Sequence, residues 1–190
     1  NADLRNAELS GTSLRYANLE NADLRQIKIS NTYFKNANLS FARLDNTNLH
    51  NADFFNVNFT SANLENSDLS RAFLHGAILK NANLINSNLL QAELAYADLS
   101  NSNLSNANLK QTDLIFADFS NANISGANLL LSYSKNAKFN NVIITDDTKL
   151  DSCFQKGFLD KVMCQASRNL NSDSPPFYGE MRSYHRDDIL

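Results

Sequence analysis

The sequence predicts a solenoid, a rod of short stacked units, over residues 1–145. Central positions spaced five residues apart, from Leu4 to Ile144, hold Leu, Phe or Ile at 28 of 29 sites, and Ser134 is the exception. The residue two places before each central site is small at nearly every step. A period of five matches neither a helix nor a simple strand. A five-residue unit also cannot bury its own Leu, so successive units must stack around a shared core.

The tandem motif A-[DN]-L-x-x resembles the pentapeptide-repeat family over these residues, for example in NANLI NSNLL QAELA YADLS at 81–100. The resemblance implies an all-β fold, a right-handed quadrilateral β-helix of about seven coils. Four pentapeptides form the four sides of one coil, with the central residue and the small residue before it pointing inward. The apolar character of these two sites and the polar character of the other three agree with that orientation.

Opposite walls of such a coil lie close together, so we expect the bulky residues Ile27 and Val57 to swell it locally. From Leu129 the repeat falters, and its last acceptable unit is Val142-Ile143-Ile144. The segment Thr145–Thr148 then predicts a turn and a possible helix start.

Residues 146–168 are expected to form a C-terminal capping helix region, because an open solenoid end exposes core residues and strand edges. The alternative is a dimerisation element, as C-terminal helices are in some members of the family. The apolar residues of the helical pattern are Phe154, Phe158, Leu159, Val162 and Met163. Residues 169–190 form a linker and a tail, for which disorder, packing back on the solenoid and a recognition role all stay open.

Composition excludes several classes of function. The 20 acidic and 17 basic residues give a formal net charge of −3, which favours neither a nucleic-acid binder nor a strongly acidic protein. No apolar run is long enough to span a membrane. If the segment between Cys153 and Cys164 is helical, the two cysteines are too far apart for a disulfide, so a reducing compartment is favoured. We expect a cytoplasmic protein, or one delivered to a host cytoplasm as part of a secreted effector. Because the chain opens on Asn1 within a repeat, we also expect further residues before it.

Catalysis requires groups that converge in a pocket, and a filled rod offers none. We therefore expect no enzyme activity, no catalytic residues, no cofactor and no small-molecule substrate. His50 and His75 fall on adjacent sides of the coil and have no cysteine nearby, so no metal site is expected.

In the twenty-residue coil that the resemblance implies, residues twenty apart in sequence should stack in columns that run along the rod. Successive residues of one column should lie about 4.8 Å apart. Contiguous exposed aromatic residues usually mark an interface, and one side of the coil is rich in them. The candidate contact residues are Tyr16, Tyr33, Phe55, Phe73, Tyr96, Ile115, Phe116 and Tyr133, with His75 in the same columns. The alternative is that the C-terminal helix or tail covers this side. Leu90, Leu130 and Leu131 on the adjoining side could extend the patch.

Polar columns suggest two further roles. In the column Asn81, Asn101, Asn121 and Asn141, side-chain hydrogen bonds between coils are expected. Glu93 and Asp113 share one column, and Asp98 and Asp118 share the next. Such carboxylates loosely resemble those of pentapeptide-repeat proteins that imitate DNA and bind type II topoisomerases, but this rod has 14 acids against 12 bases up to Lys149.

The leading hypothesis for function is a non-enzymatic protein-interaction scaffold, acting on a protein partner or as a homodimer. It could be the interaction module of a larger bacterial protein or effector. Two alternatives stay open: a DNA mimic directed at a topoisomerase, and a non-catalytic domain cut from a larger enzyme.

Overall fold

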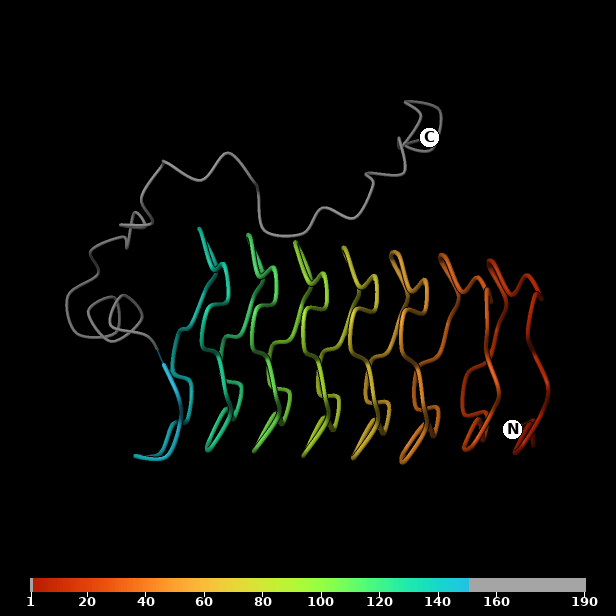
Figure 1. Cartoon of the computed structure of the whole chain (residues 1–190), viewed down its shortest axis with the longest axis horizontal. Helices are drawn as coiled ribbons and strands as arrows, with labels where there is room; N and C mark the ends of the chain where they lie inside the picture. Colours follow the sequence, from red (N-terminus) through yellow and green to blue (C-terminus); the bar gives the residue numbers. More distant parts are fainter. Residues whose placement is uncertain (1, 151–190) are drawn as a thin grey trace, which may run out of the picture.

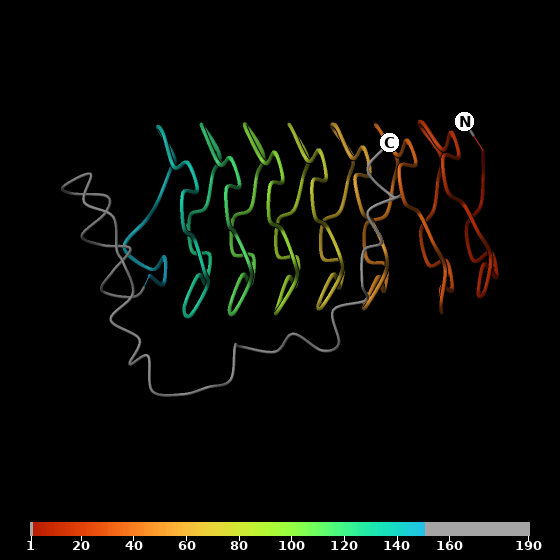
Figure 2. The same cartoon turned by 90° about the horizontal axis from the view of Figure 1, so that it is seen from above.

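The described part of the protein is a rod of stacked coils, as Figures 1 and 2 show in two perpendicular views. A computed structural model describes residues 2–150. The proposed cap, with Phe154, Phe158, Leu159, Val162 and Met163, lies outside the described residues, as does the tail at 169–190. Within the described part, no segment forms a strand or helix longer than a single bridged residue.

The coils pair in a fixed register of twenty residues. Each side contributes one residue per coil to a parallel ladder, for example Asp23 with Arg43 and then Arg43 with Asn63. The other three ladders contain the pairs Asn48–Asp68, Asp53–Phe73 and Asn58–Ile78. Four ladders offset by five residues mean four pentapeptides per coil, as the family resemblance implied.

A tight turn follows each central residue and makes one corner of the coil. In the first corner the N–H of Ala7 donates to the carbonyl of Leu4 at 2.9 Å, and Asn6 between them has a φ of 59°. The equivalent residue has a positive φ at every corner from Asn6 to Asn141. Gly and Asn adopt this left-handed conformation at the lowest cost, which explains why Asn is so frequent at this position.

Hydrogen bonds between coils satisfy the backbone of each side. In a typical side the N–H of Leu44 donates to the carbonyl of Asn63 at 2.8 Å, and the N–H of Asn63 donates to the carbonyl of Ala42 at 2.9 Å. The N–H of Asn46 donates to the carbonyl of Glu65 at 2.9 Å. Three bonds per pentapeptide, with the corner bond added, leave few backbone groups of the inner coils unpaired.

The core is a set of stacked apolar side chains along the rod axis. The central residues from Phe34 to Leu129 are all Leu, Phe or Ile, and every one of them is fully buried. Several polar residues at the small inward site bond to the corner beside them, and the hydroxyls of Ser67 and Thr112 donate to the carbonyls of Leu64 and Leu109 at 2.6 and 2.7 Å. The buried Ser87 hydroxyl, by contrast, has no partner among the described residues. Ile144, expected at an inward site, is 44% exposed because no described coil covers it.

Of the two bulky inward residues, only Ile27 coincides with a break in the pairing. No bridge joins Lys28 to Asn48 among the described residues, and the N–H of Gln26 donates to the Thr47 hydroxyl at 3.1 Å instead of to a carbonyl of the next coil. The corner bond from Ile27 to Leu24 is stretched to 3.5 Å.

Val57 does not disturb the pairing of its coil, and the local swelling expected at Ile27 and Val57 stays a prediction. The N–H of Ile78 donates to the Val57 carbonyl at 2.9 Å, as in regular coils. Val57 stacks between Ala37 and Ala77, whereas Ile27 stacks against the branched Thr47. The size of the neighbours one coil away therefore decides whether a bulky inward side chain is accommodated.

The expected turn at Thr145–Thr148 is present and shifts the register by one residue. Asn123 pairs with Ile143, twenty residues on, but Asn128 pairs with Lys149. Thr148 donates its N–H to the Thr145 carbonyl at 3.0 Å. Pairing thus extends past residue 145 to Lys149.

The expected Asn ladder exists, but mainly in other columns. In the predicted column only Asn141 donates to Asn121, at 3.4 Å. Shorter side-chain bonds join asparagines just before the central residue, such as Asn108 to Asn88 at 3.0 Å and Asn83 to Asn63 at 3.0 Å. The asparagines at the corners are favoured chiefly because Asn tolerates a positive φ.

This corner geometry can be tested at Asn101, which is exposed and has a φ of 59°. We expect Asn101→Ala to lower the free energy of unfolding by about 1 kcal/mol, because Ala disfavours the left-handed region. Asn101→Gly should leave it within about 0.5 kcal/mol of wild type. Urea unfolding measures both, with Lys80→Ala, an exposed position outside the positive-φ set, as control. Equal losses for Ala and Gly would contradict this account.

Candidate functional site

The candidate site is the aromatic face, the side of the rod whose bridged residues run from Ser13 to Tyr133. Four rings form one row along it: Phe55, His75, Tyr96 and Phe116. Adjacent ring centroids are 5.4, 5.2 and 5.0 Å apart in that order. The first and last pairs are stacked, with planes 2° and 15° apart. These separations are those of favourable aromatic contacts, so the row is continuous over four coils.

Phe55 and His75 belong to one column, whereas Tyr96 and Phe116 belong to the neighbouring corner column. Small residues lie where the row passes from one column to the other. Gly76, at the corner one coil before Tyr96, has a φ of +66°, and a Cβ there would collide with the Oδ1 atom of Asn56. Ala95, which follows His75 in its column, is only 7% exposed although its position points outward. Neighbouring side chains therefore close over Ala95, and the ring of Tyr96 reaches that of His75.

Basic side chains lie over rings at the N-terminal end of the aromatic face. The Nζ atom of Lys35 is 4.9 Å from the Phe55 ring centroid, and the Cζ atom of Arg15 is 5.4 Å from that of Tyr33. Both distances are within the range of cation–π attraction. No described cation makes such a contact with Tyr96 or Phe116.

The other candidate residues lie on this side but outside the row. Tyr16 is 74% exposed at a corner of the first coil, and Tyr33 contacts Arg15. Ile115 is half-buried beside Phe116. Phe73 and Tyr133 are bridged to Glu93 and Asp113 respectively, so they lie at either end of that acidic pair.

Glu93 and Asp113 occupy adjacent coils within the aromatic face. Burial, and then the charge of Asp113, raise the pKa of Glu93. Burial also raises the pKa of Asp113, although the Ile115 N–H donates to its Oδ1 atom at 3.0 Å. Burial lowers the pKa of His75 despite the Asp113 charge. Neither carboxylate has an ion pair with a described residue.

Asp98 and Asp118 pair on the next side, as the sequence predicted, but their environment differs. The Lys138 ammonium lies 3.1 Å from Asp118. Burial acts to raise the pKa of Asp118, but hydrogen bonds from Ser120 and the charge of Lys138 outweigh it and leave that pKa lowered. The four carboxylates therefore do not act as one acidic surface.

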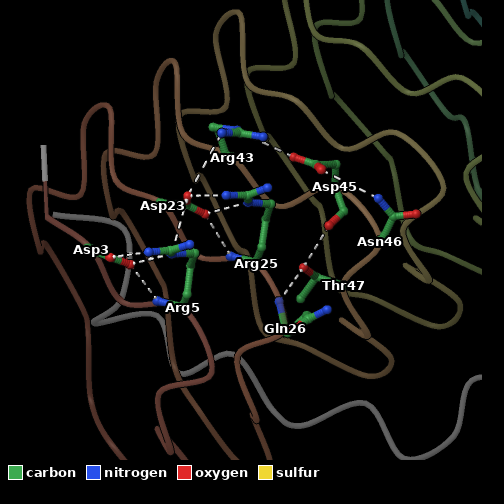
Figure 3. Close-up of polar contacts among 9 residues, drawn as sticks. All are labelled: Asp3, Arg5, Asp23, Arg25, Gln26, Arg43, Asp45, Asn46 and Thr47. Carbon is green, nitrogen blue, oxygen red and sulfur yellow. Dashed lines mark hydrogen bonds and ion pairs between the residues drawn. The ribbon is translucent and has the colours of Figure 1, made fainter.

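On another side, arginine and aspartate residues from successive coils interlock (Figure 3). Arg25 donates to Asp23 at 2.6 and 2.8 Å, and the guanidinium groups of Arg5 and Arg43 also lie within 3.9 Å of Asp23. The side-chain hydrogen bond from Arg25 lowers the pKa of Asp23, and that from Arg5 lowers the pKa of Asp3 to about 2. This charge compensation is absent around Glu93 and Asp113.

Sequence analysis placed the two acids in one column but did not recognise that they belong to the aromatic face. The twenty-residue spacing from Phe73 through Glu93 and Asp113 to Tyr133 was the available signal. The adjoining leucines do not form a continuous extension, because Lys110 lies between Leu90 and Leu130 in their column. Leu131 is 48% exposed at a corner.

The remaining histidine of residues 2–150 lies apart from the aromatic face. His50 contacts the Ser70 hydroxyl at 2.8 Å on a different side from His75. Residues 2–150 contain no group of three or more potential metal ligands. Nor does that part of the chain include a helix able to cross a membrane.

The opposite pKa shifts of two carboxylates predict opposite mutational effects. A raised pKa means that ionisation opposes folding, so Asp113→Asn should stabilise the chain at pH 7 by a few tenths of a kcal/mol. Asp118→Asn should destabilise it by a similar amount, because a lowered pKa means that ionisation favours folding.

Thermal unfolding at pH 7 and at pH 3 measures both effects. Each difference should shrink as the pH falls through the pKa values of these groups, since the wild-type carboxyls then become neutral in both states. A loss of stability in Asp113→Asn at pH 7 would show that its charge has a favourable partner.

The family model for pentapeptide repeats matches this chain in eight copies, at residues 1–31, 32–71, 58–91 and 92–129. Comparison with curated proteins gave no match. Among solved structures, HetL, a pentapeptide repeat protein involved in heterocyst differentiation regulation in the cyanobacterium Nostoc sp. strain PCC 7120, is 25% identical. That alignment covers 78% of this chain and 92% of HetL, with a TM-score of 0.44.

Two further structures are more distant in sequence or coverage. Trypsin-treated QnrB1, a plasmid-mediated fluoroquinolone resistance protein, is 15% identical over 84% of this chain and 86% of its own, with a TM-score of 0.41. A pentapeptide repeat protein of the Arabidopsis thaliana thylakoid lumen is 30% identical over 60% of this chain and 65% of its own, with a TM-score of 0.35. Because the family model covers most of the chain, this protein belongs to the pentapeptide-repeat family, and its rod is the family's right-handed quadrilateral β-helix.

Proposed function

We propose that this chain is a non-enzymatic protein-interaction scaffold whose contact surface is the aromatic face. The observation that carries the proposal is the continuous row of rings from Phe55 to Phe116, with Tyr96 57% and Phe116 47% exposed. Exposed apolar surface of this extent is typical of interfaces, where aromatic residues are enriched.

The stability of the rod does not account for these rings. Tyr96 and Phe116 occupy corners with φ values of 60° and 56°, where Asn or Gly would be about 1 kcal/mol more favourable per residue. Both rings also keep about half of their surface in water. Phe41 on a different side shares both features, so the stacking of Tyr96 and Phe116 in adjacent coils, with centroids 5.0 Å apart, is what favours a contact with another protein at this position.

The rod suits such a contact because its surface is held rigid. The N–H groups of Tyr96 and Phe116 donate to the carbonyls of Ile115 and Lys135 in the following coils at 2.8 and 3.0 Å. The inward residues beside them, Leu94 and Leu114, are fully buried. The backbone of this surface is therefore already ordered in the folded rod, so that binding does not have to order it.

A DNA-mimic function directed at a topoisomerase has less support from the charges. The acids that interlock with arginines in Figure 3, and Asp118 with Lys138, are compensated within the rod. A mimic of the phosphate backbone requires a regular array of uncompensated negative charges. We therefore favour the scaffold, with either a different protein or a second copy of the chain as partner.

The double variant Tyr96→Asn/Phe116→Asn tests the proposal, because Asn tolerates the corner conformation. In sedimentation equilibrium of the full chain, we expect any wild-type self-association to weaken at least tenfold in this variant. If the wild type is monomeric, retention of a partner in a pull-down should fall to the same extent.

Phe41→Asn provides the matched control, since Phe41 is 53% exposed at a corner with a φ of 58° on a different side. It should bind as wild type. Binding that survives in the double variant but is lost in the control would contradict the proposal. A loss of more than about 2 kcal/mol of stability in the double variant would mean that the rings serve the chain's own folding.

A further inference from the structure

The C-terminal half of the aromatic face combines two features that differ in chemistry. One is the ring pair Tyr96–Phe116, with centroids 5.0 Å apart and planes 15° apart. The other is the acidic pair Glu93–Asp113, bridged to each other and flanked along their column by Phe73 and Tyr133. Glu93 and Tyr96 belong to the same side of one coil, and Asp113 and Phe116 belong to the same side of the next coil. The acids and the rings therefore lie on the same two coils.

Neither feature has a lysine or arginine partner within residues 2–150. At the N-terminal end of the same face, the chain places its own cations over rings, with Lys35 over Phe55 and Arg15 over Tyr33. At the C-terminal end, no described lysine or arginine makes a cation–π contact with Tyr96 or Phe116, and the one basic ring nearby is that of His75, 5.2 Å from Tyr96. No described basic side chain forms an ion pair with Glu93 or Asp113 either.

Among the described carboxylates, the acidic pair is distinguished by its raised pKa values and not by the lack of an ion pair, because Asp53, Asp68 and Asp98 have no ion pair with a described residue either. Asp3, Glu8, Asp23 and Asp118 each have a basic partner within 4 Å. Glu93 and Asp113 are instead half-buried on the aromatic face, and burial raises the pKa of both, although the charge of His75 acts to lower that of Asp113. A partly desolvated carboxylate pair gains more from an incoming cation than an exposed pair does, because the local dielectric is lower.

A guanidinium group complements both features at once. Its planar fork donates two hydrogen bonds to a carboxylate, and its face stacks on an aromatic ring. Adjacent coils set Glu93 and Asp113 about 4.8 Å apart at the backbone, so one guanidinium can contact both carboxylates. A lysine ammonium could satisfy the charge but not the stacking.

We propose that the surface formed by Glu93, Asp113, Tyr96 and Phe116 binds an arginine side chain of a partner protein. The guanidinium lies against the two carboxylates and packs on the ring pair, while apolar residues of the partner cover the rest of the row. This inference rests on the proposed scaffold function and specifies the chemistry of its partner.

The probe is an acetylated nonapeptide that carries two arginines among leucine and glycine residues. Its matched control carries citrulline, an uncharged isostere, in place of both arginines. Each peptide is titrated into the full ¹⁵N-labelled chain at pH 7, and the amide signals of Glu93, Tyr96, Asp113 and Phe116 are followed.

We expect the arginine peptide to shift these signals and to bind at least tenfold more tightly than the citrulline peptide. Glu93→Gln/Asp113→Asn should remove this tenfold preference, and its thermal unfolding shows whether the rod is intact. Asp98→Asn, an acid on the next side, is the control and should keep the preference. The preference should also fall as the pH is lowered from 7, because raised pKa values favour the neutral forms of Glu93 and Asp113 and because His75, which interacts with Asp113, gains a positive charge.

The outcomes separate this inference from the scaffold proposal. If Phe116→Asn weakens both peptides but the acid variant keeps the arginine preference, the aromatic face binds protein and the arginine assignment is wrong. If neither variant changes binding, both proposals fail. No shift at peptide concentrations up to 10 mM would overturn the arginine assignment directly.

Discussion

A left-handed corner at every fifth residue is the constraint on which the whole structure depends. The corner residue, with φ values near 60°, turns the chain after each central side chain, so that the next pentapeptide begins a new side. Four such corners return the chain to the same side one coil later, in register for backbone hydrogen bonding. The inward stack, the outward columns and the flat sides all follow from this repetition. Non-Gly residues occupy most corners, so the rod accepts a modest backbone strain that its core and hydrogen bonds must offset.

The inward sites were predictable because they depend on the period alone. The register and the columns of the aromatic face also required the four sides per coil that the family resemblance implied, and the structure confirms that residues twenty apart are paired. The number of sides came from the family resemblance, since the period of five does not by itself fix it. Contacts between columns could not be predicted. Whether the ring of Tyr96 reaches His75 depends on the space left by Ala95 and on the conformation at Gly76.

Departures from regularity were harder to predict, because they depend on which residues stack one coil away. Ile27 and Val57 both break the small-residue rule, yet only the coil at Ile27 loses its pairing. The single-residue shift before Lys149 likewise has a local cause: the hydroxyls of Thr145 and Thr148 both accept from the Gly126 N–H at 3.0 Å, in place of a backbone carbonyl. Such side-chain substitutes for backbone acceptors are specific to one site and have no periodic signal.

The sides of the rod differ most in how their charges are compensated. Near the N-terminus, arginines from three coils surround Asp23. On the aromatic face, by contrast, Glu93 and Asp113 are desolvated without a basic partner among the described residues. The same repeat thus supports a side whose charges are compensated and a side where two carboxylates are not, which is the physical basis on which we propose the aromatic face as the contact surface.

The central claim is that a rigid, regularly paired rod displays the aromatic row, and native-state hydrogen exchange tests it most directly. The N–H groups of Asn56, Gly76, Tyr96 and Phe116 donate to the next coil at 2.8–3.0 Å, so they should exchange only through global unfolding. The N–H groups of Ile29, Asn31 and Asn48 have no partner among the described residues and should exchange much faster. Exchange beneath the row as fast as at Ile29 would contradict the claim, because the rings would then lie on a surface that opens locally.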